Sequence, residues 1–181
     1  MMRKFVMVLA AGAALVFGAG LAEAHGPSRQ KVIQEVTLNA TPDEVWAVIG
    51  KFDDLSWYPR AKSVEVEPGA EVKPGEQRTV TWDNGEQTTE QLTKWNPEGH
   101  TYSYRTITDN IKALAVTNYS GIIAVKDEGG KAKVEWTGAF YRGFPNNDPP
   151  PELNDEAAIA TVTAAHQMGI DALVQKFGKA N

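Results

Sequence analysis

The chain has 181 residues, with 23 acidic against 18 basic side chains and a formal net charge of −5. An acidic chain of this kind is poorly suited to nucleic acid or to an anionic membrane surface as its main partner. It contains no cysteine, which excludes disulfides, thiolate metal sites and thiol nucleophiles.

Residues 1–24 have the pattern of a signal peptide. Arg3 and Lys4 precede an apolar run over residues 5–21 that is rich in alanine and glycine, and Ala22-Glu23-Ala24 supplies a small-x-small cleavage site. We therefore expect export of the chain and removal of this segment. The alternative is an uncleaved membrane anchor, which the weak hydrophobicity of the run disfavours.

The remainder of the chain is expected to form one domain. Cleavage would leave His25 as the first residue, residues 25–30 are polar and predict a flexible lead, and residues 31–181 have the length of a single domain with its own core. No further apolar run reads as a membrane span, so we expect no spanning segment after cleavage.

The predicted domain begins with a strand and two short helices. Residues 31–38 alternate in polarity, which is typical of a strand. Thr41-Pro42-Asp43-Glu44 predicts a helix start, because Thr41 can cap it, proline suits the first position and Glu44 can close a capping box. Gly50 should end this helix. Residues 52–58 predict a second short helix, which Pro59 ends.

Six further strand-like runs follow, each separated from the next by a turn-rich segment. Short connections of this kind imply antiparallel neighbours. The runs cover residues 63–67, 77–82, 86–95, 101–108, 116–126 and 131–142.

Residues 153–177 predict a long amphipathic helix, with Asn154 or Asp155 as its cap. Its expected apolar face carries Ile159, Val162, His166, Gly169, Ile170, Leu173 and Phe177. Strands followed by one long amphipathic helix predict an α+β protein. In it, a curved antiparallel sheet of about seven strands wraps around the C-terminal helix, because each has one apolar face to bury.

This order of elements resembles the helix-grip fold of the START and Bet v 1-like (SRPBCC) superfamily, and several strand motifs resemble its polyketide-cyclase-like branch. Those motifs are Gly75-Glu76-Gln77-Arg78, Thr89-Glu90-Gln91-Leu92, Tyr102-Ser103-Tyr104, Asn118-Tyr119 and Trp136-Thr137-Gly138-Ala139-Phe140. A closer resemblance is to the MxaD type, small exported proteins linked to methanol oxidation. It is carried by His25-Gly26-Pro27, Val45-Trp46-Ala47-Val48-Ile49-Gly50, Trp57-Tyr58-Pro59 and Phe140-Tyr141-Arg142-Gly143-Phe144-Pro145-Asn146-Asn147.

The resemblance implies a hydrophobic cavity between sheet and helix. For the MxaD type it implies a periplasmic role beside the quinone-dependent methanol dehydrogenase and its cytochrome acceptor. It implies no catalytic residue set, and we expect no cofactor.

Strand alternation gives an independent expectation of which side chains face the cavity. On the last strand Trp136 and Phe140 share the apolar face, and Tyr119 lies on the inward face of the strand before it. Tyr102 and Tyr104 share a face of the preceding strand and are placed inward by its apolar content. Trp57 and Tyr58, which follow the short helices, are expected at the cavity mouth or in the core.

Arg78 and Glu90 form a pair whose register depends on one hairpin. A two-residue loop at Asn84-Gly85 would set Arg78 opposite Gln91. A three-residue loop, with Gly85 as the left-handed residue of a bulge, would set it opposite Glu90, and the family pattern favours this second register. The pair would be either a ligand-binding group at the cavity or a structural ion pair at the sheet rim.

His166 is unusual because it lies on the apolar stripe of the last helix. It is either a core histidine hydrogen-bonded to Tyr104 or Tyr119, or a ligand contact or proton donor inside the cavity. The three histidines of the chain are not expected to meet, so we expect no metal site.

The connection from Arg142 to Glu152 is longer than a turn requires, and its three prolines at 149–151 stiffen it. Arg142 and Phe144 are therefore candidates for docking on a partner, because arginine and aromatic side chains dominate interface energetics. The alternative is a structural strap over the start of the helix.

Three functions follow as hypotheses. The first is a non-catalytic periplasmic accessory protein that docks on the methanol dehydrogenase system. The second is a carrier of a hydrophobic or quinone-like small molecule. The third is a cyclase- or hydrolase-type enzyme that uses Glu90, His166 and a tyrosine as acid–base groups.

Overall fold

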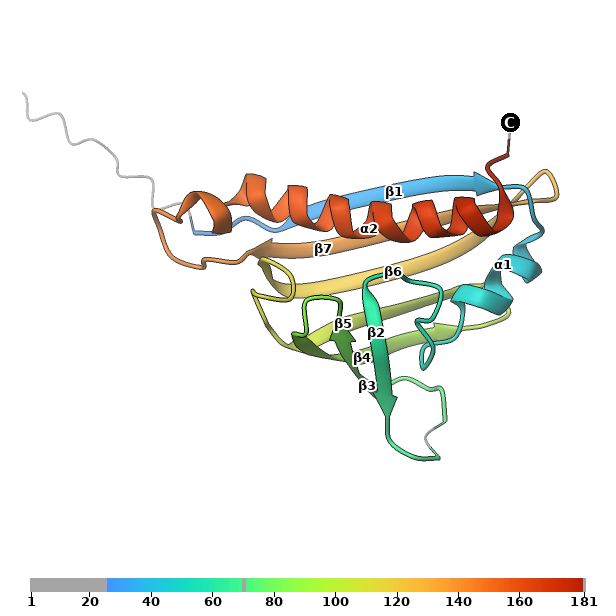
Figure 1. Cartoon of the computed structure of the whole chain (residues 1–181), viewed down its shortest axis with the longest axis horizontal. Helices are drawn as coiled ribbons and strands as arrows, with labels where there is room; N and C mark the ends of the chain where they lie inside the picture. The colour runs from blue at the N-terminus through green and yellow to red at the C-terminus, as the bar shows by residue number, and fades with distance from the viewer. Residues whose placement is uncertain (1–25, 70, 181) are drawn as a thin grey trace, which may run out of the picture.

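A curved antiparallel sheet packed on one long helix forms the domain in the computed structural model, which describes residues 26–69 and 71–180 (Figure 1). The predicted signal peptide and His25 lie outside the described residues. The elements in chain order are β1 (Gln30–Leu38), α1 (Pro42–Ile49), β2 (Ala61–Val66), β3 (Gln77–Trp82), β4 (Gln87–Asn96), β5 (Thr101–Thr108), β6 (Val116–Glu128), β7 (Lys131–Arg142), the 3₁₀ turn η1 (Pro151–Leu153) and α2 (Asp155–Phe177).

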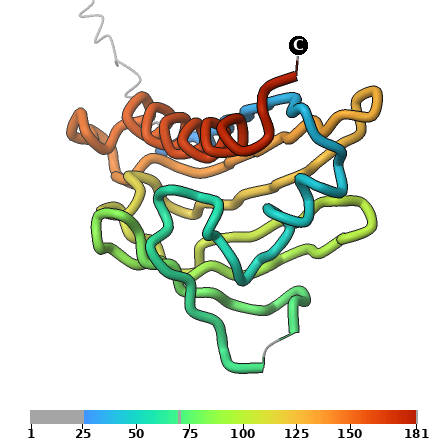
Figure 2. Tube along the Cα trace, turned by 45° about the vertical axis from the view of Figure 1, so that its right-hand side comes forward, coloured from blue at the N-terminus to red at the C-terminus, as the bar shows by residue number. Residues whose placement is uncertain are grey.

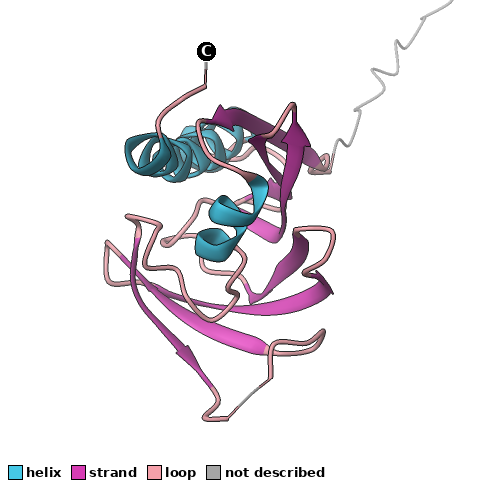
Figure 3. Ribbon diagram, turned by 90° about the vertical axis from the view of Figure 1, so that its right-hand side faces the viewer, coloured by secondary structure: helices cyan, strands magenta, loops and turns pink. Residues whose placement is uncertain are grey.

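The seven strands form one sheet in the order β1-β7-β6-β5-β4-β3-β2, with every neighbouring pair antiparallel. Helix α2 lies over β1 and β7, while β2 to β4 lie on the far side of the molecule (Figure 2). Viewed from the side, the sheet curves from the strands beside α2 to those below α1 (Figure 3). The expected helix-grip arrangement of α+β type is confirmed.

The predicted caps form as the sequence indicates. The Thr41 hydroxyl accepts a hydrogen bond from the Glu44 backbone N–H at 3.3 Å, and Glu44 Oε2 accepts one from the Thr41 N–H at 2.8 Å. At α2, Asn154 Oδ1 accepts from the Ala157 N–H at 2.8 Å. These bonds satisfy N–H groups that a helix start leaves free, so both helix starts follow from local sequence.

The second short helix predicted over residues 52–58 is wrong, because that segment is a series of turns. Asp54 Oδ1 accepts a hydrogen bond from the Ser56 N–H, two residues further on, at 2.8 Å. This local bond gives the backbone an alternative to the helix. The same segment buries Phe52, Leu55 and Tyr58, so tertiary packing holds the turns in place.

Helix α2 buries one stripe against the sheet, formed by Ala158, Val162, Ala165, His166, Gly169, Ile170 and Leu173. Ile159, predicted on this stripe, is 39 % exposed, because Ala158 takes the buried position at the first turn. By length and composition α2 could also cross a membrane, with a mean hydropathy of 1.2. Since its apolar stripe packs on β1 and β7, α2 is the core helix of this domain.

Candidate ligand cavity

A small cavity lies between α2 and the inner face of the sheet. Its wall comes from β3 to β7, from α2 and from the connecting segments 55–60 and 109–114. The space open to the centres of water-sized spheres is about 50 Å³, and we call this space the inner chamber. The inner chamber together with its mouth, counted out to open solvent, encloses about 700 Å³.

Nine of the ten residues predicted to face the cavity line it in the structure. They are Trp57, Tyr58, Arg78, Glu90, Tyr102, Tyr104, Tyr119, Trp136 and His166. Alternation along the strands therefore places inward side chains well. Their role toward a ligand stays a proposal.

Phe140 is the exception, and its predicted place in the cavity wall is wrong. It is fully buried, but its ring stacks on Tyr119 with centroids 6.3 Å apart, and it does not line the cavity. The Tyr119 ring, on which Phe140 stacks, does line the cavity. Phe140 is on the predicted face of β7, at a position where the core is filled with side chains.

Arg78 and Glu90 face each other across β3 and β4, in the predicted register. The hairpin is closed by a hydrogen bond from the Trp82 N–H to the Glu86 carbonyl at 2.8 Å, and Gly85 has φ of +82°. Glycine adopts that left-handed conformation without strain. The three-residue loop with a glycine bulge, and not the two-residue loop, therefore sets the register.

The Arg78–Glu90 pair is deeply buried, with 2 % and 5 % of each residue exposed, so it does not lie at the sheet rim. Glu90 Oε2 accepts from Arg78 Nε at 2.8 Å and lies 2.7 Å from Nη2, while Nη1 donates to the Phe52 carbonyl at 2.6 Å. Burial lowers the pKa of Arg78, but the Glu90 carboxylate together with Tyr102 and Tyr104 outweighs it, so the pKa of Arg78 is raised. The guanidinium therefore stays charged within the cavity wall.

His166 is a core histidine bonded to Tyr119, one of its two predicted partners. Its Nε2 lies 2.7 Å from the Tyr119 hydroxyl, and its ring stacks on Trp136 with centroids 4.3 Å apart and planes inclined by 13°. Burial lowers the pKa of His166 to about 4, and a weaker interaction with the Trp136 backbone opposes this. The imidazole is therefore neutral at pH 7.

Tyr58 belongs to the core and not to the mouth. It is 5 % exposed, and its hydroxyl donates to the Ala165 carbonyl in α2 at 2.9 Å. Burial raises the pKa of this hydroxyl well above its usual value. Trp57 is half-buried and packs on Trp136 with ring centroids 5.8 Å apart. Tyr58 therefore fastens the turn segment to α2, and Trp57 packs it on β7.

Three glycines on inward faces, to which the sequence analysis gave no role, make room for the rings of this wall. A Cβ on Gly121 would come within 2.3 Å of the Tyr104 ring, and one on Gly169 within 2.6 Å of Trp136. A Cβ on Gly138 would lie 3.0 Å from His166. The available signal was a glycine at an inward position of a predicted strand or helix.

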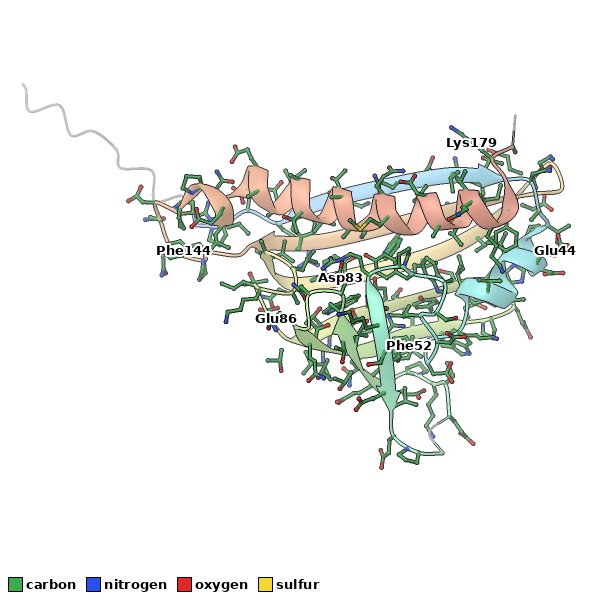
Figure 4. All side chains as sticks on the ribbon, in the orientation of Figure 1. Glu44, Phe52, Asp83, Glu86, Phe144 and Lys179 are labelled. Carbon is green, nitrogen blue, oxygen red and sulfur yellow. The ribbon has the colours of Figure 1, made fainter. Side chains whose placement is uncertain are left out.

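The mouth is closed by side chains that the sequence analysis also missed. Arg60 donates to the Ala113 carbonyl at 3.0 Å and lies 3.5 Å from Asp83 of the β3–β4 hairpin. Asn84 donates to the Lys112 carbonyl at 2.8 Å, and Asn110 donates to Glu86 at 2.9 Å; Figure 4 labels Asp83 and Glu86. These bonds join segments far apart in sequence, so single-sequence patterns cannot find them.

Arg142 is not available for docking, which corrects that prediction. It is 7 % exposed, and it donates to the carbonyls of Phe144 at 2.9 Å and Asn146 at 3.0 Å, and to Asp155 at 3.4 Å. Phe144 is half-buried, and its N–H donates to the Leu153 carbonyl at 3.2 Å. The connection is therefore a strap held over the start of α2, the predicted alternative.

Acidic and histidine side chains do not gather into a metal site in the described ranges 26–69 and 71–180. No group of three His, Asp or Glu residues there lies close enough to hold a metal ion.

A curved antiparallel sheet that grips a C-terminal helix around a buried cavity defines a helix-grip protein. The chain belongs to the polyketide cyclase/dehydrase and lipid transport family, which it matches over residues 29–178. No curated protein matches the sequence.

Solved structures similar to this chain include two from Bacillus. The protein XoxI from Bacillus cereus is 29 % identical, with a TM-score of 0.67 over 81 % of this chain and 94 % of that one. An uncharacterised protein from Bacillus thuringiensis is 28 % identical, with a TM-score of 0.65 over 83 % and 98 %. Truncated norcoclaurine synthase from Thalictrum flavum is 17 % identical, with a TM-score of 0.61 over 83 % and 94 %, a likeness of fold alone.

Proposed function

We propose that this chain is an exported, non-catalytic accessory protein of methanol oxidation that binds the quinone-dependent methanol dehydrogenase or its cytochrome acceptor. The observation that carries the proposal is the likeness to XoxI over 94 % of that chain, together with the motifs that resemble the MxaD type. The strongest of those motifs, residues 140–147, forms the end of β7 and the strap.

The pairing of the buried titratable groups supports binding over catalysis. Glu90 is held by Arg78, and His166 is bonded to Tyr119 and neutral at pH 7. A general acid or base needs a proton-exchanging atom aimed at substrate and a pKa near the working pH. Burial moves the pKa of His166 away from that range, and raises the pKa of Tyr104 and Tyr119 well above it.

The strap offers the most suitable docking surface. Pro145, Asn146, Asn147 and Asp148 are exposed at its outer side, while Arg142 and three prolines hold its backbone. A fixed, exposed loop loses little conformational entropy when a partner binds it. Phe144, at this end of the molecule, lies opposite the end that carries Glu44 and Lys179 (Figure 4).

The experiment is an electron-transfer assay. The rate at which methanol dehydrogenase reduces its cytochrome acceptor is measured with and without the mature chain. An accessory role predicts that the chain changes this rate saturably and oxidises no methanol by itself. An unchanged rate at saturating protein would refute the role.

Variants of the strap locate the docking surface. The double change Asn146→Ala, Asn147→Ala should weaken the effect on the rate, because it alters exposed side chains and leaves the Arg142 bonds to backbone carbonyls in place. Glu98→Ala, at the exposed β4–β5 turn, is the matched control and should behave as the unmodified chain. Equal loss in both variants would rule out the strap as the specific contact.

Export is tested separately. Mass spectrometry of the periplasmic fraction should find a chain that begins at His25. A full-length product in the membrane fraction would overturn the proposed localisation.

The second candidate function is that of a carrier of a small molecule. The presence of the cavity favours it, but the volume of the cavity limits which molecules could be carried. An engineered cavity of about 150 Å³ holds a benzene ring in a protein core, whereas the inner chamber has about 50 Å³. A quinone ring does not fit inside without rearrangement of the wall.

A further inference from the structure

Four polar atoms on residues of the cavity wall are buried without a hydrogen-bond partner in the described part of the chain. They are the Tyr102 hydroxyl, Nε1 of Trp57, Nε1 of Trp136 and Nδ1 of His166. Tyr102, Trp136 and His166 are each more than nine-tenths buried, and all four residues line the same cavity. Unpaired buried polar groups are costly in a core, so their concentration here indicates a place for a polar guest.

These atoms are mostly hydrogen-bond donors. An indole N–H can only donate, and a tyrosine hydroxyl donates readily. When the Tyr119 hydroxyl donates to Nε2 of His166, the hydrogen of the neutral imidazole is on Nδ1, which then donates as well. The other unpartnered buried atoms in residues 26–69 and 71–180 are oxygens of Gln34, Glu76 and Asp155, none of which lines the chamber. A guest that pairs with these atoms must therefore carry a hydrogen-bond acceptor.

The charge of the wall favours a guest without net charge. The charged lining residues are Arg60, Arg78, Glu90 and Asp109, two of each sign. Arg78 and Glu90 already neutralise each other at 2.7 Å, and Arg60 is engaged with Asp83. Asp109 is exposed, and its Oδ1 accepts from the Asn118 N–H at 2.8 Å. An anion or a cation buried in the chamber would therefore lose its hydration without gaining a free buried counter-charge.

The size of the chamber limits the guest to a few atoms. A water molecule needs about 10–15 Å³ of the space measured in this way, and the chamber has about 50 Å³. The space therefore corresponds to about four water-sized groups. The aromatic side chains of Tyr104, Trp136 and His166 are part of its lining, which suits a molecule with one polar oxygen and apolar remaining atoms.

We propose that the inner chamber binds a small uncharged carbonyl compound, a ketone, aldehyde or amide of low molecular weight, whose oxygen accepts hydrogen bonds from Tyr102 or Trp136. The proposal goes beyond the accessory function and does not depend on it, because the chamber can bind such a molecule whether or not the chain docks on a dehydrogenase.

Three probes of nearly the same shape test the proposal on the purified mature chain. Acetone is uncharged and carries a carbonyl, isobutene has the same skeleton without oxygen, and acetate has the same shape with a charge. The indole ¹H–¹⁵N signals of the protein are followed during each titration. Acetone is expected to shift the Trp136 or Trp57 signal saturably, with isobutene and acetate binding at least about tenfold more weakly.

Two outcomes would overturn the proposal. Isobutene binding as tightly as acetone would mean that the chamber selects shape and not an acceptor. The absence of a saturable shift with acetone would mean that ordered water alone satisfies the four buried groups.

Variants assign the donors. Trp136→Phe and Tyr102→Phe each remove a polar atom and keep the ring, and at least one should weaken acetone binding about tenfold. Trp95→Phe, on β4 and outside the lining, is the matched control and should leave the affinity unchanged. Since Trp136→Phe could also disturb the stacking on His166, Tyr102→Phe is the cleaner variant. Unchanged acetone affinity in both folded variants would refute the assignment of these donors.

Discussion

At the scale of single residues, Arg78 and Glu90 form a buried ion pair in the described cavity wall. Both are at least 95 % buried, and each is the nearest charge partner of the other at 2.7 Å. A buried pair of this kind contributes little net stability relative to apolar side chains, but removal of one member leaves an uncompensated charge in the core.

Replacement of Arg78 by Met should therefore lower the free energy of unfolding by about 3–5 kcal/mol. The double variant Arg78→Met, Glu90→Leu should recover a large part of that loss, because no charge is left unpaired. Chemical denaturation of the unmodified chain, Arg78→Met, Glu90→Leu and the double variant measures these free energies. The exposed pair Lys126–Glu135 is the control, and Lys126→Met should cost no more than about 1 kcal/mol. Additive losses at Arg78 and Glu90 would contradict the pairing.

His166 should make the stability depend on pH. Burial lowers the pKa of the folded state to about 4 from the usual 6.5, so between these values the unfolded chain binds a proton that the folded chain does not. The contribution of the neutral His166 to the free energy of unfolding is complete above pH 6.5 and is lost as the pH falls to 4. The loss amounts to about 3 kcal/mol.

Urea unfolding at several pH values between 4 and 7 checks this dependence. His166→Phe keeps a ring against Trp136 and should remove that part of the slope, apart from a constant offset for the unpaired Tyr119 hydroxyl. His100→Asn is the control, since asparagine tolerates the positive φ of 46° at that position, and it should keep the slope. An unchanged slope in His166→Phe would assign the dependence to other groups.

At the scale of elements, the strap between β7 and α2 depends on one side chain. The Arg142 guanidinium bonds to two carbonyls of the strap and to Asp155 at the start of α2. Arg142→Ala should lower the free energy of unfolding by about 1–3 kcal/mol and raise hydrogen exchange over residues 143–153. Arg142→Lys should not restore protection, because an ammonium group cannot reproduce the three-way fork.

Arg105→Ala is the control for the strap. Arg105 is exposed and bonds only to Gln91 among the described side chains, so its loss should leave exchange at 143–153 unchanged. Equal exchange in Arg142→Ala and the unmodified chain would show that the prolines alone hold the strap.

The elements that could be predicted are those with a local cause. Thr41 and Asn154 cap their helices through bonds within three residues, and Gly85 fixes the register of Arg78 through a bulge. The helix predicted over residues 52–58 is wrong because Phe52 and Tyr58 are held by contacts with distant elements. The docking role predicted for Arg142 is wrong for the same reason, because its partner Asp155 belongs to another element. Arginine is ordinarily exposed, so no local pattern indicates this burial.

At the scale of the whole molecule, the proposed docking surface and the inner chamber occupy different parts of one domain. The cavity lies under α2 and is closed at its mouth by the segments around Arg60 and Asn110. The strap with Phe144 lies at the start of α2, and Glu44 and Lys179 mark the opposite end (Figure 4). A partner on the strap and a small molecule in the chamber could therefore bind at the same time.

The proposed accessory function is tested most directly by the affinity of the mature chain for the purified quinone-dependent methanol dehydrogenase and, separately, for its cytochrome acceptor. Isothermal titration calorimetry at low ionic strength should give saturable binding to at least one of them, and weaker binding for the Asn146→Ala, Asn147→Ala variant. No measurable binding of the folded chain to either protein, alone or mixed, would contradict the accessory function.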